Sequence, residues 1–445
     1  MSSTDDTTTD PTVAVPDAVR RDERIEPQIR GLEPGECVRV VATTSDDAGD
    51  WRSTATLSAD DDGVVDLATT APDAGEYETA DAMGLVWTLA PVDDSARAFE
   101  WEPDGRHDLT LAVHAVDGEQ ESPASANAKS ADAVVDRDPL ATESVTVDHA
   151  DPSVTRHTPA EDHPDDGHPD AWFEPAGDGP HPAVVVLHGS GGRSVEATAA
   201  LFASHGYAAF ACRWLRADGF PEHPMEVPID RVEDAIAWFR DHDAVADGGY
   251  GLWGVSMGSQ LALQLAVRDD AVDAVVADSP VHVRLFGSGT GAWAVDGDVQ
   301  PYVDRREEPP DRFVYDDDDS TVGRELPTQM YEAASREERQ AATIPVEDAS
   351  ADVLLLTGSD DHHWPATAFS NMLLVRLDAK DYDHRYAHDV HHRAGHSIGV
   401  PYHPTSFRPA PDDVQIGFGG TPRHAARAAA DAWPRTLDWL ETSLR

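Results

Sequence analysis

The sequence predicts two domains, an antiparallel β-sandwich followed by an α/β domain with a mostly parallel, doubly wound sheet. The chain has 445 residues, more than one hydrophobic core usually holds. Short alternating segments fill residues 25–150, whereas apolar strand patterns alternate with helical patterns over 151–445. A Gly-x-Ser-x-Gly turn also stands between a strand and a helix at residues 254–258.

Residues 1–24 are rich in Ser, Thr and Asp, and we expect them to form a disordered acidic tail. They lack the apolar core of a signal peptide, and no apolar run in the sequence has the length needed to span a bilayer. We therefore expect a cytoplasmic protein without a membrane anchor.

In the first domain, residues 25–150, apolar and polar residues alternate in short segments such as 37–41 and 109–113. Turn signals such as Pro34-Gly35 and Asp62-Gly63 separate these segments, which is typical of antiparallel strands. No combination of Ser, His and Asp in this domain indicates catalysis. We expect it to have a structural or substrate-shaping role.

The second domain, residues 151–445, opens with a segment rich in His, Pro and Asp that we expect to be a linker or loop. The expected strands are 183–187, 207–212, 272–277 and 353–356, with another leading into the serine turn, and the expected helices are 195–204, 232–239, 260–268 and 424–440. A polar, Asp-rich insertion at about 281–350 separates two of these strands, and we expect it to cover the site as a cap.

Ser256 lies between Gly254 and Gly258, a spacing that places a serine on a sharp turn from strand to helix. The turn strains the serine backbone and lifts the hydroxyl clear of the sheet, and the two glycines avoid collisions with the neighbouring elements. Because the helix begins at the next residue, the backbone NH of Met257 can face a developing oxyanion. We interpret Ser256 as a nucleophile rather than as part of an ordinary turn.

A nucleophilic serine needs a base within hydrogen-bond reach and a carboxylate that holds the base. In this kind of fold the three residues follow the order Ser, acid, His, with the acid just past a strand. The strand at 353–356 leads to Gly358-Ser359-Asp360-Asp361. We prefer Asp361, since it stands beyond the turn that Gly358 makes, and Asp360 is the alternative.

The base should lie further along, and His396 in Gly395-His396-Ser397 fits this position. Its competitors are His384, His388, His391, His392 and His403. This group of histidines has no cysteine nearby and lacks the glutamate of a zinc-protease helix, so we expect no metal.

A second oxyanion donor is expected in His188-Gly189-Ser190-Gly191-Gly192, which directly follows the first strand of the second domain. Ser190 or Gly191 would donate its backbone NH alongside Met257. We expect His188 itself to brace this turn.

The formal net charge is -51, from 84 acidic and 33 basic residues. The acidic residues are spread through patterned segments, which indicates a folded, strongly hydrated surface suited to concentrated salt. Phosphate backbones would be repelled, so nucleic acid is not an expected partner. Cys37 and Cys212 lie in different domains, and we expect two buried thiols rather than a disulfide.

The chain resembles the acyl-CoA thioesterases that share their architecture with bile acid-CoA:amino acid N-acyltransferase, over nearly its whole length. The similar segments are Arg-Gly-Leu-Glu-Pro at 30–34, Met-Gly-Leu-Val-Trp at 83–87, the serine turn at 254–258, Gly-Ser-Asp-Asp-His-His-Trp at 358–364, Gly395-His396 and Gly-Gly-Thr-Pro-Arg at 419–423. The resemblance implies an immunoglobulin-like sandwich followed by an α/β-hydrolase domain. It also implies a nucleophile at Ser256, an acid at Asp361 and a base at His396.

The function that this resemblance implies is hydrolysis of acyl-CoA to free fatty acid and CoA through an acyl-enzyme, without a cofactor. The amino-acid-conjugating branch of the family carries cysteine at the position of Ser256, so serine favours water as the acyl acceptor. Two departures concern CoA recognition: Met257 stands where the thioesterases usually have lysine, and His188-Gly189-Ser190 replaces an aromatic-Gly-Thr segment. The rival interpretations are an esterase of the dienelactone hydrolase type, an acyl-CoA:amino acid N-acyltransferase, and an inactive binding scaffold.

Overall fold

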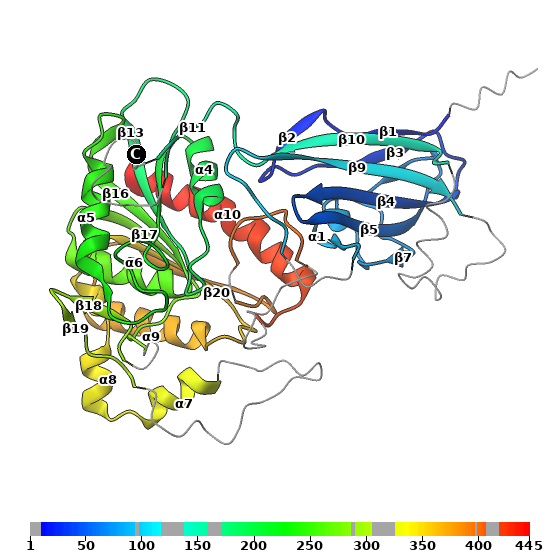
Figure 1. The fold of residues 1–445 in the computed structure, drawn as a ribbon. Helices are drawn as coiled ribbons and strands as arrows, with labels where there is room; N and C mark the ends of the chain where they lie inside the picture. Colours follow the sequence, from blue (N-terminus) through cyan, green and yellow to red (C-terminus); the bar gives the residue numbers. More distant parts are fainter. Residues whose placement is uncertain are drawn as a thin grey trace, which may run out of the picture. The chain divides into compact units, whose positions relative to one another are not determined.

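The computed structural model describes residues 10–93, 98–116, 138–158, 171–285, 290–304, 325–396, 398–405 and 418–445. It separates into two compact units (Figure 1). The first lies within residues 1–149, apart from 102–104, and includes 402–405. The second contains the remainder.

The described residues of the first unit form two β-sheets and a short helix. The smaller sheet has the strand order β1-β3-β6, formed by β1 (Thr12–Ala14), β3 (Gln28–Arg30) and β6 (Val65–Asp66). The larger has the order β2-β10-β9-β4-β5-β7, with β8 also paired to β5. Its strands are β2 (Ala18–Arg20), β4 (Cys37–Asp46), β5 (Gly49–Ser58), β7 (Ala74–Gly75), β8 (Ala90–Pro91), β9 (Arg106–Ala115) and β10 (Ala141–Asp148). The helix is α1 (Gly84–Trp87).

The predicted alternation is visible in β5, where Trp51, Ser53, Ala55 and Leu57 are buried and each is followed by a half-exposed residue. The described strand pairs of this unit are antiparallel except β2 with β10, which is parallel. The immunoglobulin-like character of the unit stays a prediction.

The prediction of a disordered tail over residues 1–24 is wrong for β1 and β2. Val13 of β1 pairs with Ile29, and Val19 of β2 pairs with Val147. Each strand is only three residues long, too short to show alternation in the sequence, and each obtains its hydrogen bonds from a distant partner strand. Residues 1–9 lie outside the described residues.

The second unit is built on an eight-stranded sheet of order β11-β12-β14-β13-β16-β17-β20-β21. Its strands are β11 (Thr155–His157), β12 (Trp172–Glu174), β13 (His181–Leu187), β14 (Ala208–Cys212), β16 (Val245–Val255), β17 (Val272–Asp278), β20 (Asp352–Gly358) and β21 (Tyr386–His391). The strands from β14 to β21 run parallel, and β11 and β12 form an antiparallel edge. The mostly parallel sheet that was predicted is therefore present.

The edge strand β11 corrects the expectation of a linker at 151–170. His157 stacks on Trp172 of β12, with ring centroids 4.1 Å apart, and its Nε2 lies 2.9 Å from a carboxylate oxygen of Glu174. These contacts fix a strand whose composition alone is typical of a loop. Residues 159–170 lie outside the described residues.

Helices cover both faces of this sheet. The helices are α4 (Glu196–Ser204), α5 (Ile229–Arg240), α6 (Met257–Arg268), α9 (Ala366–Ala379) and α10 (Pro422–Leu444). Val184 and Val186 of β13 share a core with α4 and α10, whereas Val185 and Leu187 share one with α5, α6 and α9. Alternate residues of each parallel strand are thus buried on opposite faces, which accounts for the continuous apolar runs in the sequence.

The insertion between β17 and β20 contains β18 (Trp293–Val295), β19 (Asp298–Val299), α7 (Glu325–Ala333), α8 (Arg336–Ala342) and the 3-10 helix η2 (Val346–Asp348). β18 and β19 form a small sheet with β15 (Val227–Pro228). Gln260 of α6 bonds the Val283 carbonyl and the Trp293 indole, which fastens the insertion to the helix behind Ser256. Among the described helices, none combines the length and apolarity that crossing a membrane requires.

Candidate active site

The serine turn joins β16 to α6. Ser256 has φ +58° and ψ −123°, a left-handed conformation that non-glycine residues rarely adopt. A side chain at Gly258 would meet the carbonyl oxygens of Leu187 and His188, and one at Gly254 would meet the backbone of Gly258. Both glycine positions therefore exclude a side chain, and the strained turn holds Ser256 at the end of β16.

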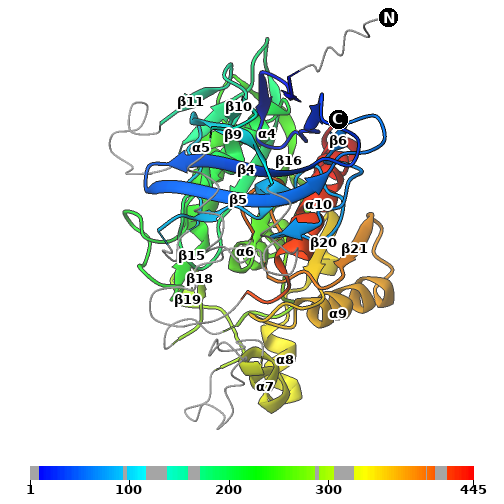
Figure 2. The same cartoon turned by 90° about the vertical axis from the view of Figure 1, so that its right-hand side faces the viewer.

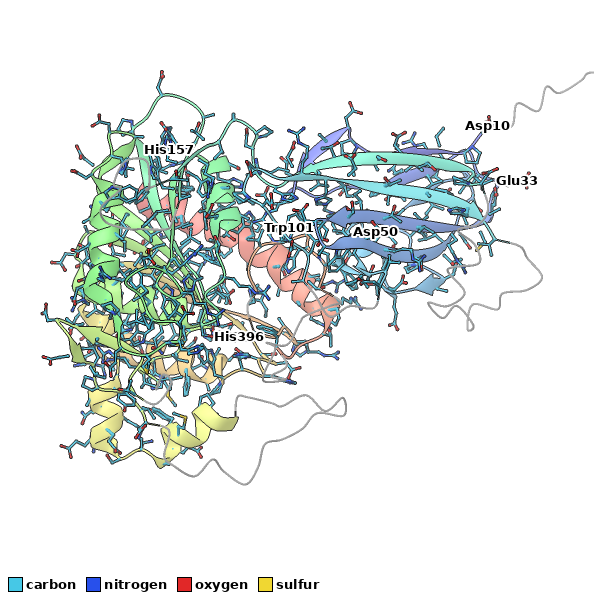
Figure 3. All side chains as sticks on the ribbon, viewed as in Figure 1. Asp10, Glu33, Asp50, Trp101, His157 and His396 are labelled. Carbon is cyan, nitrogen blue, oxygen red and sulfur yellow. The ribbon has the colours of Figure 1, made fainter. Side chains whose placement is uncertain are left out.

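Three buried side chains form a continuous hydrogen-bond chain. His396 Nε2 lies 2.9 Å from Ser256 Oγ, and His396 Nδ1 lies 2.8 Å from Asp361 Oδ2. Since Nδ1 faces a carboxylate, it carries the ring proton, and Nε2 is left to accept the serine proton. The structure thus brings together the three residues predicted as nucleophile, acid and base (His396 is labelled in Figure 3).

Asp361 and Asp360 make different contacts. Asp361 Oδ1 accepts the backbone NH groups of His363 (2.7 Å) and Trp364 (3.2 Å), which orients the carboxylate toward His396. Asp360 instead places Oδ1 3.2 Å from His362 Nε2 and accepts the Gly420 NH at 3.3 Å. Of the two alternatives, Asp361 is the carboxylate that contacts His396.

Three of the five competing histidines contact other side chains. His388 on β21 bonds Thr357 (2.8 Å) and Asn371 (3.2 Å). His384 packs on Tyr382, and His392 packs on His424. His391 closes β21, and His403 belongs to the segment that groups with the first unit.

Three backbone segments meet behind the acid and the base. The Asp360 NH donates to the Ala394 carbonyl (3.0 Å), and the His396 NH donates to the Phe418 carbonyl (2.7 Å). Asp361 also forms an isolated bridge with Gly419. A side chain on Gly395 would meet the carbonyls of this third segment, so the Gly-His spacing is a requirement of close backbone packing.

The glycine-rich turn after β13 packs directly on Ser256. A Cβ on Gly189 would lie 3.3 Å from the Ser256 Cβ, and the Gly192 NH donates to the Gly189 carbonyl at 3.1 Å. Ser190 and Gly191 occupy the tip of this turn. Met257 begins α6, where a backbone NH has no acceptor within the helix.

His188 braces this turn, as predicted. Its Nδ1 donates to the Gly189 carbonyl (2.7 Å), and its Nε2 accepts the Trp214 NH (3.1 Å). The imidazole also stacks on the Trp214 ring at 4.7 Å. Burial lowers the pKa of His188 to about 4, so the ring is neutral and both nitrogens keep these roles.

Asp278 is a buried carboxylate of the site that the sequence did not single out. It ends β17, and its Oδ2 accepts the NH groups of Ile398 (2.9 Å) and Gly399 (3.0 Å), directly beyond the His396 loop. Its carbonyl also accepts the Ser256 NH at 2.9 Å. Burial raises the pKa of Asp278 to about 6, while the charge of His396 acts in the opposite direction.

Two aromatic side chains fix the ring of His396. His363 stacks on it with centroids 4.6 Å apart, and Trp364 meets it edge-on at 5.3 Å while donating Nε1 to the Ser279 carbonyl. Burial and then the charge of His396 lower the pKa of His363 to about 3, so the stacked ring is neutral. The packing role expected for Trp364 fits these contacts.

Within the described parts of the chain, no group of three His, Cys, Asp or Glu side chains is arranged to hold a metal ion. Within the described residues, neither Cys37 nor Cys212 forms a disulfide. Cys212 is buried as expected, whereas Cys37 is only half-buried, because it begins β4 at the edge of the core.

Known families match both parts of the sequence. Residues 22–146 match the family described as "Acyl-CoA thioester hydrolase/BAAT N-terminal region", and residues 227–445 match "BAAT / Acyl-CoA thioester hydrolase C terminal". The chain belongs to this family. Similar members of the acyl-CoA thioester hydrolase/BAAT family include acyl-coenzyme A thioesterase 5 of Mus musculus, 28% identical over 95% of this chain and 94% of its own.

Another similar member is the mitochondrial acyl-coenzyme A thioesterase 2 of Homo sapiens, 27% identical over 95% of this chain and 82% of its own. Among solved structures, a Pyrococcus horikoshii acylaminoacyl peptidase has a TM-score of 0.41 over 99% of this chain and 57% of its own, at 12% identity. This last likeness is too distant to bear on activity.

Proposed function

We propose that this member of the acyl-CoA thioester hydrolase/BAAT family is a serine thioesterase that hydrolyses acyl-CoA to a free fatty acid and CoA. The observation that carries the proposal is the buried chain Ser256–His396–Asp361, with contacts of 2.9 and 2.8 Å. The names of the relatives support the substrate class, since they are acyl-coenzyme A thioesterases over nearly the whole length of this chain.

The first half-reaction acylates the serine. His396 Nε2 takes the proton of Ser256 as Oγ attacks the thioester carbonyl, and the proton then passes to the CoA sulfur as the carbon–sulfur bond breaks. Asp361 holds the ring with Nε2 toward the serine and stabilises the imidazolium that forms. Stacking of neutral His363 on His396 adds no opposing charge to this cation.

The oxyanion of the tetrahedral intermediate would be held by the backbone NH of Met257 and by that of Ser190 or Gly191. The turn that contains Ser190 packs against Ser256, and the Met257 NH belongs to the first turn of α6. Both donors are backbone groups, so they need no particular side chain at these positions.

The second half-reaction uses water as the acyl acceptor. His396 takes a proton from a water molecule, the resulting hydroxide attacks the Ser256 ester, and the proton returns to the serine oxygen as the free acid leaves. Serine at the nucleophile position favours this outcome over transfer to an amine, because the conjugating branch of the family carries cysteine there.

Purified wild type, Ser256→Ala and a control Ser144→Ala, which changes an exposed serine of β10, test the proposal on a panel of acyl-CoAs in molar KCl. We expect thiol release and free acid from wild type and Ser144→Ala, and a loss of about 10⁵-fold or more in Ser256→Ala with an unchanged unfolding midpoint. Rapid acid quenching should trap an acyl adduct on the peptide that contains Ser256.

Glycine and taurine in parallel reactions separate the rival functions. An N-acyl amino acid as the main product would show that the enzyme is an acyltransferase rather than a hydrolase. Hydrolysis of oxygen esters or lactones without any release of CoA would retain the serine mechanism and reject the thioester substrate. Equal activity of Ser256→Ala and wild type would reject the mechanism itself.

A further inference from the structure

A group of three arginines and two histidines lies beside the candidate active site. We call it the cationic cluster, and its members are His392, Arg393, Arg423, His424 and Arg427. Arg393 stands three residues before His396. The other two arginines, Arg423 and Arg427, lie in the first turns of α10. The positions 423 and 427 are one helical turn apart and therefore share a face.

Backbone contacts hold the two parts of the cluster together. The Thr421 NH donates to the Arg393 carbonyl (3.2 Å), and the Arg393 NH donates to Ser359 Oγ (2.9 Å). The rings of His392 and His424 pack edge-on at 6.1 Å. After burial, the positive charges of the other four members lower the pKa of His424, which agrees with their proximity.

The arginines of the cluster lack the carboxylate partner that several other arginines of the same unit have. Elsewhere, carboxylates pair with arginines, as in Arg268–Glu233, Arg376–Glu347, Arg385–Asp352 and Arg435–Asp389. Within the described residues, Arg393, Arg423 and Arg427 form no ion pair, and the buried Nε of Arg423 has no hydrogen-bond acceptor. The Asp360 carboxylate accepts the Gly420 NH with one oxygen and contacts His362 Nε2 with the other.

The start of α10 adds backbone donors to these side chains. Pro422 is the first helical residue, Thr421 makes no side-chain cap to the helix, and the Ala425 NH is the first to bond within it, to the Thr421 carbonyl at 2.9 Å. The NH groups of Arg423 and His424 therefore have no helical acceptor. The positive end of a 23-residue helix dipole also favours an anion here.

Unpaired cations are out of place on a chain whose formal net charge is -51, unless a ligand of negative charge uses them. Arginine forks suit phosphate oxygens, and the unbonded Arg423 Nε is one such donor. The cluster is also joined by backbone bonds to the segments that carry Asp361 and His396, and α10 runs beside β20 in both views (Figures 1 and 2). A phosphate bound here and a thioester at Ser256 would occupy the same, carboxyl edge of the sheet.

We propose that the cationic cluster binds the nucleotide phosphates of acyl-CoA while its thioester lies at Ser256. This rests on the proposed thioesterase function. It places recognition of the anionic part of CoA at the start of α10 and in the Arg393 turn, rather than at Met257. The acyl group and the pantetheine arm need no charge from the protein in this arrangement.

The triple variant Arg393→Gln/Arg423→Gln/Arg427→Gln tests the site. The control is Arg435→Gln, which changes an arginine of the same helix that pairs with Asp389. Each protein is assayed with one acyl group carried on CoA, on dephospho-CoA and on N-acetylcysteamine, which has no phosphate. We expect the ratio of kcat/KM for acyl-CoA to that for the N-acetylcysteamine thioester to fall about tenfold or more in the triple variant and to stay constant in the control.

Calorimetric binding of CoA to Ser256→Ala, with and without the triple change, gives a second readout that needs no turnover. Weakening for CoA but not dephospho-CoA would assign the cluster to the 3′-phosphate, and equal weakening would assign it to the pyrophosphate. An unchanged activity ratio and unchanged CoA binding, in a triple variant with the wild-type unfolding midpoint, would overturn the site and leave the thioesterase intact. A wild type inactive on every thioester would overturn the proposed function, and CoA binding would then still test the cluster.

Discussion

The adjacent carboxylates Asp360 and Asp361 should differ sharply in their effect on catalysis. Asp361 contacts His396 Nδ1, whereas Asp360 supports the backbone of Gly420 and pairs with His362. We expect Asp361→Asn to lower kcat by about 10⁴-fold, since the amide would favour the wrong imidazole tautomer. Asp360→Asn should lower it by less than about tenfold. Steady-state kinetics on one acyl-CoA measures kcat for both variants. A larger loss of kcat in Asp360→Asn than in Asp361→Asn would identify Asp360 as the catalytic acid.

Asp278 should make the free energy of unfolding fall, rather than rise, as pH increases. Its pKa is raised from 3.8 to about 6, so between these values the folded protein binds more protons than the unfolded chain. Stability therefore falls as pH rises from about 4 through 6, and above 6 the buried charge costs up to about 3 kcal/mol.

Asp278→Asn resembles the protonated acid and should remove this dependence. We expect the variant to match wild type near pH 4 and to exceed its free energy of unfolding by up to about 3 kcal/mol at pH 7, in denaturant titrations at fixed KCl. Its kcat should nevertheless fall, because a negative charge beside the His396 imidazolium is lost. Parallel stability curves for the two proteins from pH 4 to 7 would contradict the role of this carboxylate.

At the residue scale, the sequence predicted the groups whose spacing reflects local backbone geometry. Ser256 and Asp361 each follow a strand within a glycine turn, and His396 follows a glycine. Asp278 stands at the end of a strand, but it is one of 84 acidic residues and no turn motif marks it. The sequence could not identify His363 as a neighbour of the base, because its stacking on His396 depends on two loops that are distant in sequence.

Among the elements, the serine turn depends on a close approach that only glycine permits. At Gly258 a methyl group would meet the carbonyls of Leu187 and His188, whereas at Gly191 it would meet nothing within 4 Å. We expect Gly258→Ala to lower the free energy of unfolding by about 2 kcal/mol or more and to abolish activity. Gly191→Ala keeps its backbone NH, so both stability and activity should stay near wild type. Thermal unfolding and thiol release measure both, and a stable, active Gly258→Ala protein would refute the steric argument.

Some strands of the fold could be predicted from the sequence, and others could not. The buried parallel strands β13, β17 and β20 were predictable, because both faces of each strand are covered and the apolar runs are continuous. The three-residue strands β1, β2 and β11 were not, since their stability comes from a partner strand far along the chain. The meeting of the segments around Asp360, Ala394 and Phe418 is equally non-local.

For the whole molecule, the two compact units agree with the change of pattern near residue 150. The grouping of 402–405 with the first unit could not be predicted, since a segment that returns to an earlier part of the chain leaves no periodic signal. A hydrogen bond holds this segment to the first unit: the Thr405 NH donates to the Trp87 carbonyl at 2.9 Å. Trp87 lies in the Met-Gly-Leu-Val-Trp segment, so this motif has a packing role in the first unit.

The charge of -51 should make the stability of the whole chain rise with salt. Like charges on a folded surface repel one another more strongly than on the expanded unfolded chain, and raising KCl from 0.1 to 1 M shortens the Debye length from about 10 to 3 Å. If this relieves about 2–3 kcal/mol, the unfolding midpoint of a 445-residue chain should rise by about 2–3 °C, since the unfolding entropy is about 2.1 cal/mol/K per residue. Sucrose at matched osmolality is the control, because it favours the folded state through exclusion without screening charge. A midpoint that rises equally in sucrose and KCl, or stays flat in KCl, would show that self-repulsion does not limit the stability of this fold.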